Sequence, residues 1–308
     1  QGEASQSRVH ILSSACEFPC DVDNLKHLFS ALASGCEFQQ EIPSLRFNTE
    51  ELGNSPSIAA FLSDIDSFDS ELFQSSKAEV TTMDPQQRKL LEMFLRNYVA
   101  IDGNQLQHAV GERTGVYLGV MWTEYQHLIV AFKMPKNSFV GTGNGLSFLV
   151  GRPSFVFGLV GPSAVLDTAC SSSLVAVRLA AQATARGEAK DAHAAGTQCM
   201  LLSSTFRILS DLNALSSDGR CKTLDASADG YGRGEGFASI YVRNMLASSE
   251  HDRMNDKGNY SAKPTVSILG GGVNQDGRSS TFTAPYGPSQ ERLIIDSLIE
   301  AFTTPVDV

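Results

Sequence analysis

The sequence predicts an α/β protein in which a cysteine stands at the junction of a strand and a helix. Short apolar segments of strand length alternate along the chain with longer segments whose apolar residues recur at helical spacing. The 308 residues are 42% hydrophobic and include 26 glycines, which suits a large core with many tight turns. The segment AVLDTACSSSL, residues 164–174, runs from an apolar strand through Cys170 into a helix of small residues.

The first predicted elements are a strand and an amphipathic helix. Apolar residues between positions 9 and 12 favour the strand, and Asn24 can cap a helix that ends at Gly35. The apolar stripe of this helix comprises Leu25, Leu28, Phe29 and Leu32. Serine, proline and asparagine interrupt residues 36–82, which we expect to be irregular.

Further elements follow in alternation. Asp84 supplies an N-cap and Pro85 the first position of a second helix, whose stripe comprises Leu90, Leu91, Phe94, Leu95 and Tyr98. We expect strands at 114–120, 163–167, 191–202, 236–242 and 265–269. A last helix opens near Gly287-Pro288-Ser289. The polar stretch 248–264 is the best internal boundary of the chain.

Cys170 is the strongest candidate for a catalytic residue. A helix that starts directly after it presents unpaired backbone N–H groups and the positive end of its dipole, and both favour a thiolate. Thiolates are strong nucleophiles, so this position suits covalent catalysis. The helix from Leu174 to Ala185 is apolar nearly all round and Gly187 can end it, which predicts a buried, rigid support. The residues alone also allow a small core cysteine without a catalytic role.

Other motifs do not predict a nucleotide or hydrolase site. The glycine-rich stretches 141–145, 232–236 and 270–272 each lack a feature of nucleotide-binding loops, and we interpret them as tight turns. No G-x-S-x-G motif is present, which argues against a serine hydrolase.

The charged residues argue against a nucleic-acid partner, because the chain has a net charge of −10. One cluster of mixed sign favours a structural ion-pair network over an acid–base pair. It comprises Asp225, Asp229 and Glu235 together with Arg220, Lys222 and Arg233.

The sequence predicts an intracellular, cytoplasmic protein without a membrane span. No apolar run approaches the roughly 18 residues that a span needs. The six cysteines are too scattered for a disulfide framework or a zinc ligand set, so we expect reduced thiols and no bound metal. The amino end, QGEASQSR, shows no signal peptide, and it also lacks an initiator Met, which leaves organelle targeting open.

Five ordered blocks carry a resemblance to a known family. The longest block surrounds Cys170 and reads GRPSFVFGLVGPSAVLDTACSSSLVAVRLA at 151–180. The others are MDPQQRKLLE at 83–92, SSDGRCKTLDASADGYGRGEG at 216–236, VNQDGRS at 273–279 and TAPYGPSQERLI at 283–294. In these blocks the chain resembles the β-ketoacyl synthase (ketosynthase) domain of type I polyketide synthases. The blocks ADGYGRGEG and VNQDGRS are more similar to polyketide synthases than to fatty acid synthases.

The resemblance implies a fold and a reaction. Ketosynthases have a thiolase-like α-β-α-β-α layered fold, which places an N-terminal half at residues 8–250 and the start of a C-terminal half at 251–308. Cys170 would take an acyl chain from an acyl carrier protein, and decarboxylative Claisen condensation with malonyl-ACP would extend that chain by two carbons. The backbone N–H of Cys170 would form part of an oxyanion hole. Phe206 matches a family position near the acyl pocket, although a buried core Phe is an equal interpretation.

The resemblance also implies partners. The phosphopantetheine arm of the acyl carrier protein is the expected cosubstrate, and the domain itself would bind no metal or nicotinamide. Other polyketide synthase domains would accompany it. The family forms homodimers in which the strand before the nucleophile, here 163–167, pairs with its symmetry mate.

The histidines of the sequence do not match the family. Ketosynthases carry two catalytic histidines after the nucleophile, one in an H-G-T-G-T motif and one in an N-x-G-H motif. The six histidines here are His10, His27, His108, His127, His193 and His251, and none lies in either motif. We therefore expect a chain truncated before the catalytic histidines, in which each histidine present is a surface or packing residue.

Three alternative functions remain open at this point. A non-elongating ketosynthase would still be acylated but would act as an acyl-transfer and dimerisation scaffold. A fatty acid synthase-type ketosynthase would share the reaction. A thiolase-like enzyme that uses coenzyme A thioesters would fit the fold but not the polyketide-type blocks.

Overall fold

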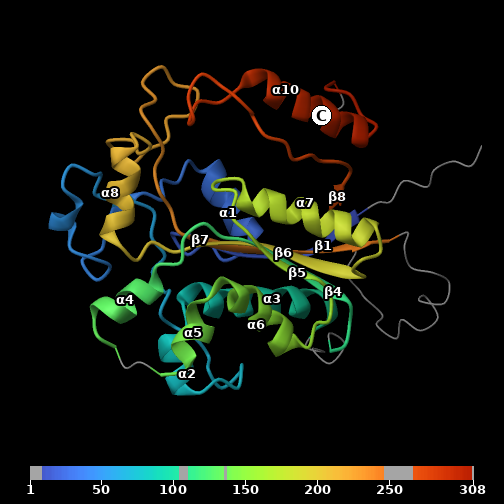
Figure 1. Cartoon of the computed structure of the whole chain (residues 1–308), viewed down its shortest axis with the longest axis horizontal. Helices are drawn as coiled ribbons and strands as arrows, with labels where there is room; N and C mark the ends of the chain where they lie inside the picture. The colour runs from blue at the N-terminus through green and yellow to red at the C-terminus, as the bar shows by residue number, and fades with distance from the viewer. Residues whose placement is uncertain (1–8, 104–109, 135–136, 246–265, 307–308) are drawn as a thin grey trace, which may run out of the picture.

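A mixed sheet of six strands forms the centre of the molecule (Figure 1), a computed structural model that describes residues 9–103, 110–134, 137–245 and 266–306. The strand order is β5-β4-β6-β7-β1-β8. The strands are β1 (Val9–Glu17), β4 (Thr114–Gly119), β5 (Ser163–Leu166), β6 (Asp191–Gln198), β7 (Gly236–Asn244) and β8 (Val266–Ile268). A separate two-stranded sheet pairs β2 (Gln40–Glu41) with β3 (Ile58–Ala59).

The three strands nearest the cysteine are parallel. β4 lies between β5 and β6 and pairs with both in parallel, whereas β7 runs antiparallel to β6 and to β1. Parallel neighbours need crossover connections, and helices provide them here. The carboxyl ends of β4, β5 and β6 therefore meet at one edge of the sheet, which is where ligands bind in open α/β sheets.

Helices cover both faces of the sheet (Figure 1). α3 (Pro85–Asp102) and α6 (Leu146–Phe157) lie on one face, and α7 (Ser172–Ala185) lies on the other. The remaining helices are α1 (Leu25–Ala33), the 3-10 turn η1 (Thr49–Leu52), α2 (Lys77–Thr82), α4 (Tyr125–Ala131), α5 (Phe139–Asn144), α8 (Ser203–Asp211) and α10 (Gly287–Glu300). These layers confirm the predicted α/β class.

The two faces of the sheet have different cores. On the α3 and α6 side, large residues such as Leu90, Phe94 and Leu149 pack against the strands. On the α7 side the buried residues of the helix are mostly alanines, and they pack on small and larger residues of the sheet: Ala176, Ala180, Ala181 and Ala183 of α7 with Val9, Tyr117, Ala192, Ala194 and Val242. Small side chains bring the axis of α7 close to the strands, so the helix that follows Cys170 is held tightly to the sheet.

The predicted elements of the sequence are largely confirmed. The helix start signals act as expected: Asn24 accepts a bond from the His27 N–H at 2.9 Å, and Asp84 accepts one from the Gln86 N–H at 2.8 Å. The expectation of irregular structure throughout 36–82 is wrong, because this stretch also contains α2 and two short strands. The helix α6 was not predicted from the sequence, because Gly151 and Pro153 interrupt its apolar pattern.

The division of the chain at 248–264 stays a prediction, since these residues lie outside the described part. β8, which falls within 251–308, pairs antiparallel with β1 of the preceding range. α10 has no buried residue, and its Ile294 and Ile299 side chains are 60% and 66% exposed. The apolar side chains Ile294 and Ile299 of this C-terminal helix are thus largely exposed.

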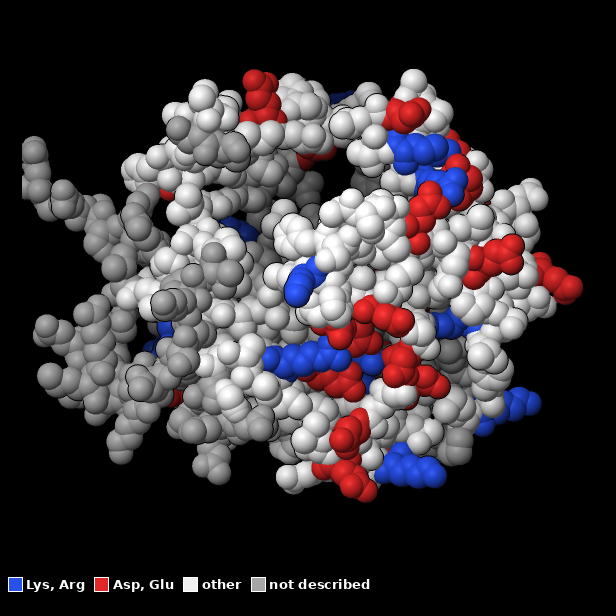
Figure 2. Space-filling view, turned by 180° about the vertical axis from the view of Figure 1, so that it is seen from behind, with Lys and Arg blue, Asp and Glu red and all other residues white. Residues whose placement is uncertain are grey.

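The surface carries both signs of charge. On the face in Figure 2, acidic and basic side chains lie interleaved in the lower half rather than in separate fields. Within the described residues, no helix combines the length and the apolar character needed to cross a membrane.

The N-cap of α3 is a buried carboxylate. Asp84 is 0% exposed, and its Oδ2 atom contacts no hydrogen-bond donor within the described residues. Burial is the largest cause of the rise in the pKa of Asp84 to about 6, and the nearby charge of Glu124 adds to it. The folded protein thus holds a proton on Asp84 at pH values where the unfolded chain has lost it.

We expect Asp84→Asn to remove a pH dependence of stability. Because the folded pKa is raised, folding takes up a proton between about pH 4 and 6, and the wild-type protein loses about 2–3 kcal/mol relative to the variant as the pH rises through this window. Asparagine still caps the helix. Urea unfolding at a series of pH values measures the difference. Asp69→Asn, at an exposed Asp that also accepts a backbone N–H, is the matched control. A constant difference between wild type and Asp84→Asn would contradict the prediction.

Candidate active site

Cys170 lies in a tight turn between β5 and α7. The strand ends at Leu166, and the helix begins at Ser172, so five residues reverse the chain direction. Ala169, directly before the cysteine, has φ 55°, a left-handed conformation that is uncommon for a residue with a side chain. The strand was predicted to extend to Asp167, and the turn in fact starts one residue earlier. This conformation directs Cys170 away from the strand, where its side chain is exposed.

Small polar side chains hold the turn. The Ser172 hydroxyl accepts a bond from the Thr168 N–H at 2.8 Å and donates one to the Ala169 carbonyl at 2.6 Å. The Asp167 carboxylate accepts a bond from the Ala169 N–H at 3.0 Å. These contacts offset the cost of the left-handed residue, which is of the order of 1 kcal/mol or more.

The first turn of α7 lies directly on the ends of two strands. A Cβ atom at Gly119, the last residue of β4, would lie 2.4 Å from the Ser172 carbonyl carbon and 2.4 Å from the Ser173 nitrogen. A Cβ atom at Gly196 in β6 would lie 2.7 Å from the Ser173 Cβ. Only glycine allows this approach, so the position of Cys170 depends on two glycines that are distant in the sequence.

The predicted burial of α7 on all sides is wrong for the described residues. Its alanines that face the sheet are buried, but Leu174, which lines a pocket beside β6 and β7, is 71% exposed. The prediction that Gly187 ends the helix is confirmed, since this glycine follows the C-cap with φ 71°.

The loop before β7 contains Tyr231, whose phenol is influenced by the charge of Cys170. Tyr231 pairs with Leu215, and its backbone bonds Ala214 and Ser216 at 3.0 Å each. Burial raises the pKa of Tyr231, Arg233 opposes the rise, and the charge of Cys170 adds to it, which places the phenol within electrostatic range of the thiol. Tyr231 belongs to the block ADGYGRGEG, but no local signal in the sequence predicted it as a site residue.

Phe206 is a core residue in the structure. Its side chain is 0% exposed, and it packs on Phe47 with ring centroids 5.6 Å apart. The Arg233 guanidinium lies over its ring at 4.4 Å from the centroid. The surrounding cluster comprises Ile42, Leu52, Ala59, Phe61, Met200, Leu209 and Leu215. A role for Phe206 in gating substrate entry stays a prediction.

The carboxylates in the 220–235 cluster are engaged in structural contacts. Glu235 accepts two bonds from Arg46, at 3.1 and 3.0 Å, and two from the backbone N–H groups of Leu62 and Met200, at 2.9 and 2.8 Å. Asp229 pairs with Lys222 at 2.6 Å, and this contact is the largest cause that lowers its pKa. The interpretation as a structural network is therefore confirmed for these two residues.

A further buried carboxylate holds the same region from the other side. Glu124 accepts bonds from the backbone N–H groups of Leu201 and Leu202, at 2.6 and 2.8 Å, and from the Thr205 hydroxyl. Together with Glu235 it fixes the backbone that leads from β6 to α8. Sequence reasoning missed Glu124, because nothing in its local pattern distinguishes it from a surface acid.

The described histidines occupy packing or surface positions. His193 is 0% exposed and stacks on Phe94 with centroids 3.9 Å apart, and burial lowers its pKa to about 3. His10 bonds Ser267 at 2.9 Å, and His27 pairs with Asp23 at 2.8 Å. His127 is exposed. His108 and His251 lie outside the described residues.

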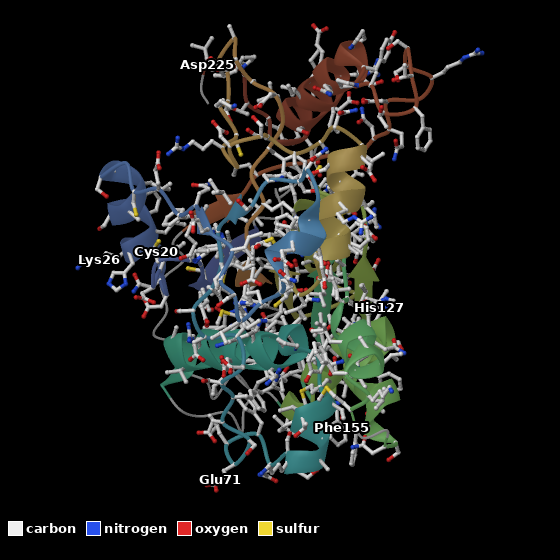
Figure 3. All side chains as sticks on the ribbon, turned by 90° about the vertical axis from the view of Figure 1, so that its left-hand side faces the viewer. Cys20, Lys26, Glu71, His127, Phe155 and Asp225 are labelled. Carbon is white, nitrogen blue, oxygen red and sulfur yellow. The ribbon has the colours of Figure 1, made fainter. Side chains whose placement is uncertain are left out.

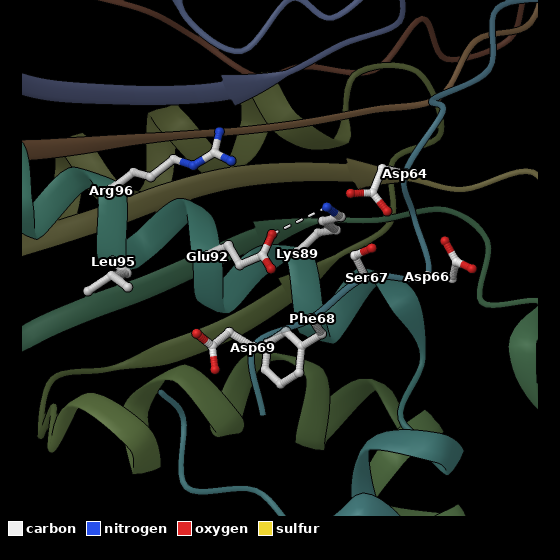
Figure 4. A pocket seen from close by; sticks show the side chains of 9 residues that line it. All are labelled: Asp64, Asp66, Ser67, Phe68, Asp69, Lys89, Glu92, Leu95 and Arg96. Carbon is white, nitrogen blue, oxygen red and sulfur yellow. Dashed lines mark ion pairs between the residues drawn. The ribbon is translucent and has the colours of Figure 1, made fainter. Parts of the chain in front are cut away.

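One open cavity of about 730 Å³ lies beside α3 and does not include Cys170 (Figure 4). Its lining residues are Asp64, Asp66, Ser67, Phe68, Asp69, Lys89, Glu92, Leu95 and Arg96. The Lys89 ammonium bonds Glu92 at 3.3 Å and Glu17 at 3.0 Å. In the part of the chain that the structure describes, no group of three or more His, Cys, Asp or Glu side chains is arranged to hold a metal ion. The lining of this cavity therefore includes the ion pair of Lys89 with Glu92 and shows no metal site among the described residues.

Fold and site together define a thiolase-like protein of the ketosynthase class, with a cysteine after a parallel strand and before a helix. The sequence profile described as "Beta-ketoacyl synthase, N-terminal domain" matches residues 6–246. The chain belongs to this family. The ketosynthase from module 6 of the bacillaene synthase of Bacillus subtilis 168 superposes with a TM-score of 0.83 and 27% identity, covering 96% of this chain and 49% of that one. For the oxazolomycin ketosynthase domain OzmH KS7 of Streptomyces albus JA3453 the TM-score is 0.85, with 27% identity and coverage of 98% and 53%.

Characterised relatives are polyketide synthases. The chain is 36% identical to the pikromycin polyketide synthase component PikAII of Streptomyces venezuelae, over 100% of this chain and 8% of that protein. It is 34% identical to the polyketide synthase GfsE of Streptomyces halstedii, again over 100% of this chain and 8% of that protein. The chain thus spans about half of the solved ketosynthases and less than a tenth of these two synthases.

We expect Gly119→Ala to destabilise the protein by about 1–3 kcal/mol, because the new methyl group meets the backbone of α7 and the helix must move. Gly151→Ala is the matched control, since a Cβ atom at that helical position has nothing within 4 Å. It should leave stability unchanged or raise it by up to about 1 kcal/mol. Urea unfolding measures both variants, and equal stability of Gly119→Ala and wild type would contradict the close approach.

Proposed function

We propose that this chain is the nucleophile-bearing part of a polyketide synthase ketosynthase and that Cys170 receives the growing acyl chain. The observation that carries the proposal is the strained turn at Ala169, which presents an exposed thiol at the first turn of a helix fixed to the sheet. The polyketide-type sequence blocks and the polyketide synthase relatives favour this function over a fatty acid synthase or a coenzyme A-dependent thiolase.

The proposed reaction has two stages. The Cys170 sulfur attacks the carbonyl of an acyl thioester on the phosphopantetheine arm of an acyl carrier protein, and the pantetheine thiol leaves with the proton. A malonyl unit on a carrier protein then loses carbon dioxide, and its enolate carbon attacks the acyl-Cys170 thioester. The Cys170 thiolate leaves, and the carrier holds a β-ketoacyl chain longer by two carbons. The domain uses no metal or nicotinamide in these steps.

The turn suits stabilisation of the oxyanion that forms in each attack. The Ser171 and Ser172 N–H groups already donate to Thr168 and Ala169, at 3.3 and 3.1 Å. The proposed donor is instead the backbone N–H of Cys170, whose position the same turn fixes. The H-G-T-G-T and N-x-G-H motifs of the family do not occur in this sequence.

The proposed partners include a second copy of the chain and the other domains of an intracellular synthase. β5 is an edge strand of the sheet and pairs only with β4 among the described strands. An edge strand exposes unpaired backbone groups that can pair with an identical strand about a twofold axis.

The proposal also includes the division of the chain into two parts. Residues 8–250 would form the N-terminal half of the ketosynthase, and residues 251–308 would form the start of its C-terminal half.

We expect Cys170→Ala to abolish acyl transfer from a carrier thioester or its pantetheine mimic while the fold stays intact. The side chain is exposed, so its truncation removes the nucleophile with little loss of packing. Intact-protein mass spectrometry should detect one acyl adduct on wild type and none on the variant. Cys221→Ala, which removes another exposed thiol, is the control and should be acylated like wild type. An equal adduct on Cys170→Ala would refute the assignment.

We expect the 308-residue chain alone to be acylated but not to condense. Its sequence holds the nucleophile and neither motif histidine, so it lacks the groups that would stabilise the enolate. A carrier-dependent condensation assay compares it with the same chain joined to a segment that carries both motifs. Acylation without condensation by the longer protein would favour the non-elongating scaffold. Product formation by the short chain at a similar rate would show that our account of the histidines is wrong.

A further inference from the structure

Two exposed thiols, Cys20 before α1 and Cys36 after it, lie close to the same backbone carbonyl, remote in sequence from Cys170. The Cys20 and Cys36 Sγ atoms lie 4.0 and 3.9 Å from the same acceptor, the Glu37 carbonyl oxygen. Burial is the largest cause that raises the pKa of Cys20, and the neighbouring Cys36 adds to the rise. Figure 3 shows Cys20 at the edge of the molecule, on the side that α1 occupies.

The backbone holds Cys20 in place before the helix begins. Cys20 and Asp21 have φ values of 62° and 57°, and the Phe18 N–H donates to the Val22 carbonyl at 2.7 Å. Two successive residues with side chains in the left-handed region form a tight, specific turn rather than a loose loop. The direction of the Cys20 side chain is therefore set locally.

The end of the helix holds Cys36 independently. The Gly35 N–H donates to Leu32 at 3.1 Å and the Cys36 N–H donates to Ala31 at 2.9 Å, and Gly35 has φ 67°. These two bonds form a Schellman motif, in which Cys36 is the C″ residue. The next residue is anchored as well, since the Glu37 carboxylate pairs with Arg220 at 2.6 Å.

We propose that Cys20 and Cys36 are a redox-active pair that forms a reversible disulfide when the protein meets a small-molecule disulfide such as oxidised glutathione. One thiol loses its proton and attacks a sulfur of the oxidant, and one glutathione thiolate leaves. The second cysteine then attacks the mixed disulfide, and the other glutathione leaves as thiolate. The two protons lost by the cysteines pass to the two glutathione thiolates, and the two electrons from the cysteine pair reduce the glutathione disulfide.

Their exposure and their position near one carbonyl oxygen separate Cys20 and Cys36 from the other cysteines. Cys16 and Cys199 are buried, and burial raises the pKa of both thiols, which disfavours their attack on an external disulfide. Cys221 is exposed, but its sulfur accepts a bond from the Gly232 N–H at 3.5 Å in a different loop. Partial burial and the neighbouring Cys36 raise the pKa of Cys20 as well, so exposure and the nearby second thiol, rather than the pKa, distinguish this pair.

The disulfide would fasten α1 to the body of the protein. α1 has no buried residue, and its Phe29 and Leu32 side chains are 69% and 59% exposed. A link from residue 20 to residue 36 closes a short loop around the whole helix. Loop closure of this size lowers the population of the unfolded chain on the order of a hundredfold.

The test uses the full chain with Cys170→Ala, so its outcome does not depend on the proposed catalytic function. The folded protein is incubated with oxidised glutathione at neutral pH and digested with trypsin and a glutamate-specific protease. Cleavage after Glu17, Lys26 and Glu37 separates residues 18–26, which contain Cys20 but not Cys16, from residues 27–37, which contain Cys36. We expect these two peptides to be recovered joined, and dithiothreitol to release them.

Two controls make the result decisive. Cys36→Ser should leave glutathione attached to Cys20 and no joined peptides, and it should lose the gain in urea resistance that oxidation confers. The crosslink should also form at least about tenfold faster in the folded protein than in the urea-unfolded chain, because the fold holds the two thiols close together. Glutathione on both cysteines without a crosslink, a crosslink to Cys16 or Cys221, or equal rates in folded and unfolded chain would overturn the proposal.

Discussion

The close approach of α7 to the sheet is the constraint on which the rest of the site depends. Gly119 and Gly196 leave no side chain between the strand ends and the first helical turn, and the alanines of α7 extend the approach along the helix. A helix packed this closely has little freedom to move along the sheet, because a side chain larger than glycine at these positions would meet atoms of the helix. The close packing of α7 on the sheet positions Cys170, whose own side chain is exposed.

The left-handed conformation of Ala169 depends on the rigid packing of α7 that follows it. A left-handed residue persists only where its surroundings determine its conformation, and here the bonds from Ser172 and Asp167 do so. The same side chains that satisfy the turn leave the thiol exposed. A rigid support on the sheet side and an exposed thiol fit the proposed role of Cys170 as the acceptor of an acyl chain.

Two buried acidic side chains fix the backbone between β6 and α8. Glu124 and Glu235 each accept backbone N–H bonds from this segment, and Glu235 also binds Arg46. Both side chains are buried, so removing either set of partners would leave an unpaired acidic group in the core. Arg233 lies over the Phe206 ring, and the charges of Glu124 and Glu235 oppose the fall that burial causes in the pKa of Arg233. The segment is thus held to the core through charge as well as apolar packing.

The sequence by itself determined the elements that local signals specify. The caps at Asn24 and Asp84, the terminator at Gly187, the strand periods and the strand–cysteine–helix junction are all short-range features, and five ordered blocks pointed to the ketosynthase family. Only the tertiary structure decided which groups meet across long stretches of chain. These contacts join residues that no local pattern connects: the close approach of α7 to Gly119 and Gly196, the buried positions of Glu124, His193 and Phe206, and the position of Cys20 and Cys36 near one carbonyl oxygen. The physical reason is that caps and periodicity act within a turn or a strand, whereas burial and charge pairing depend on how the layers pack.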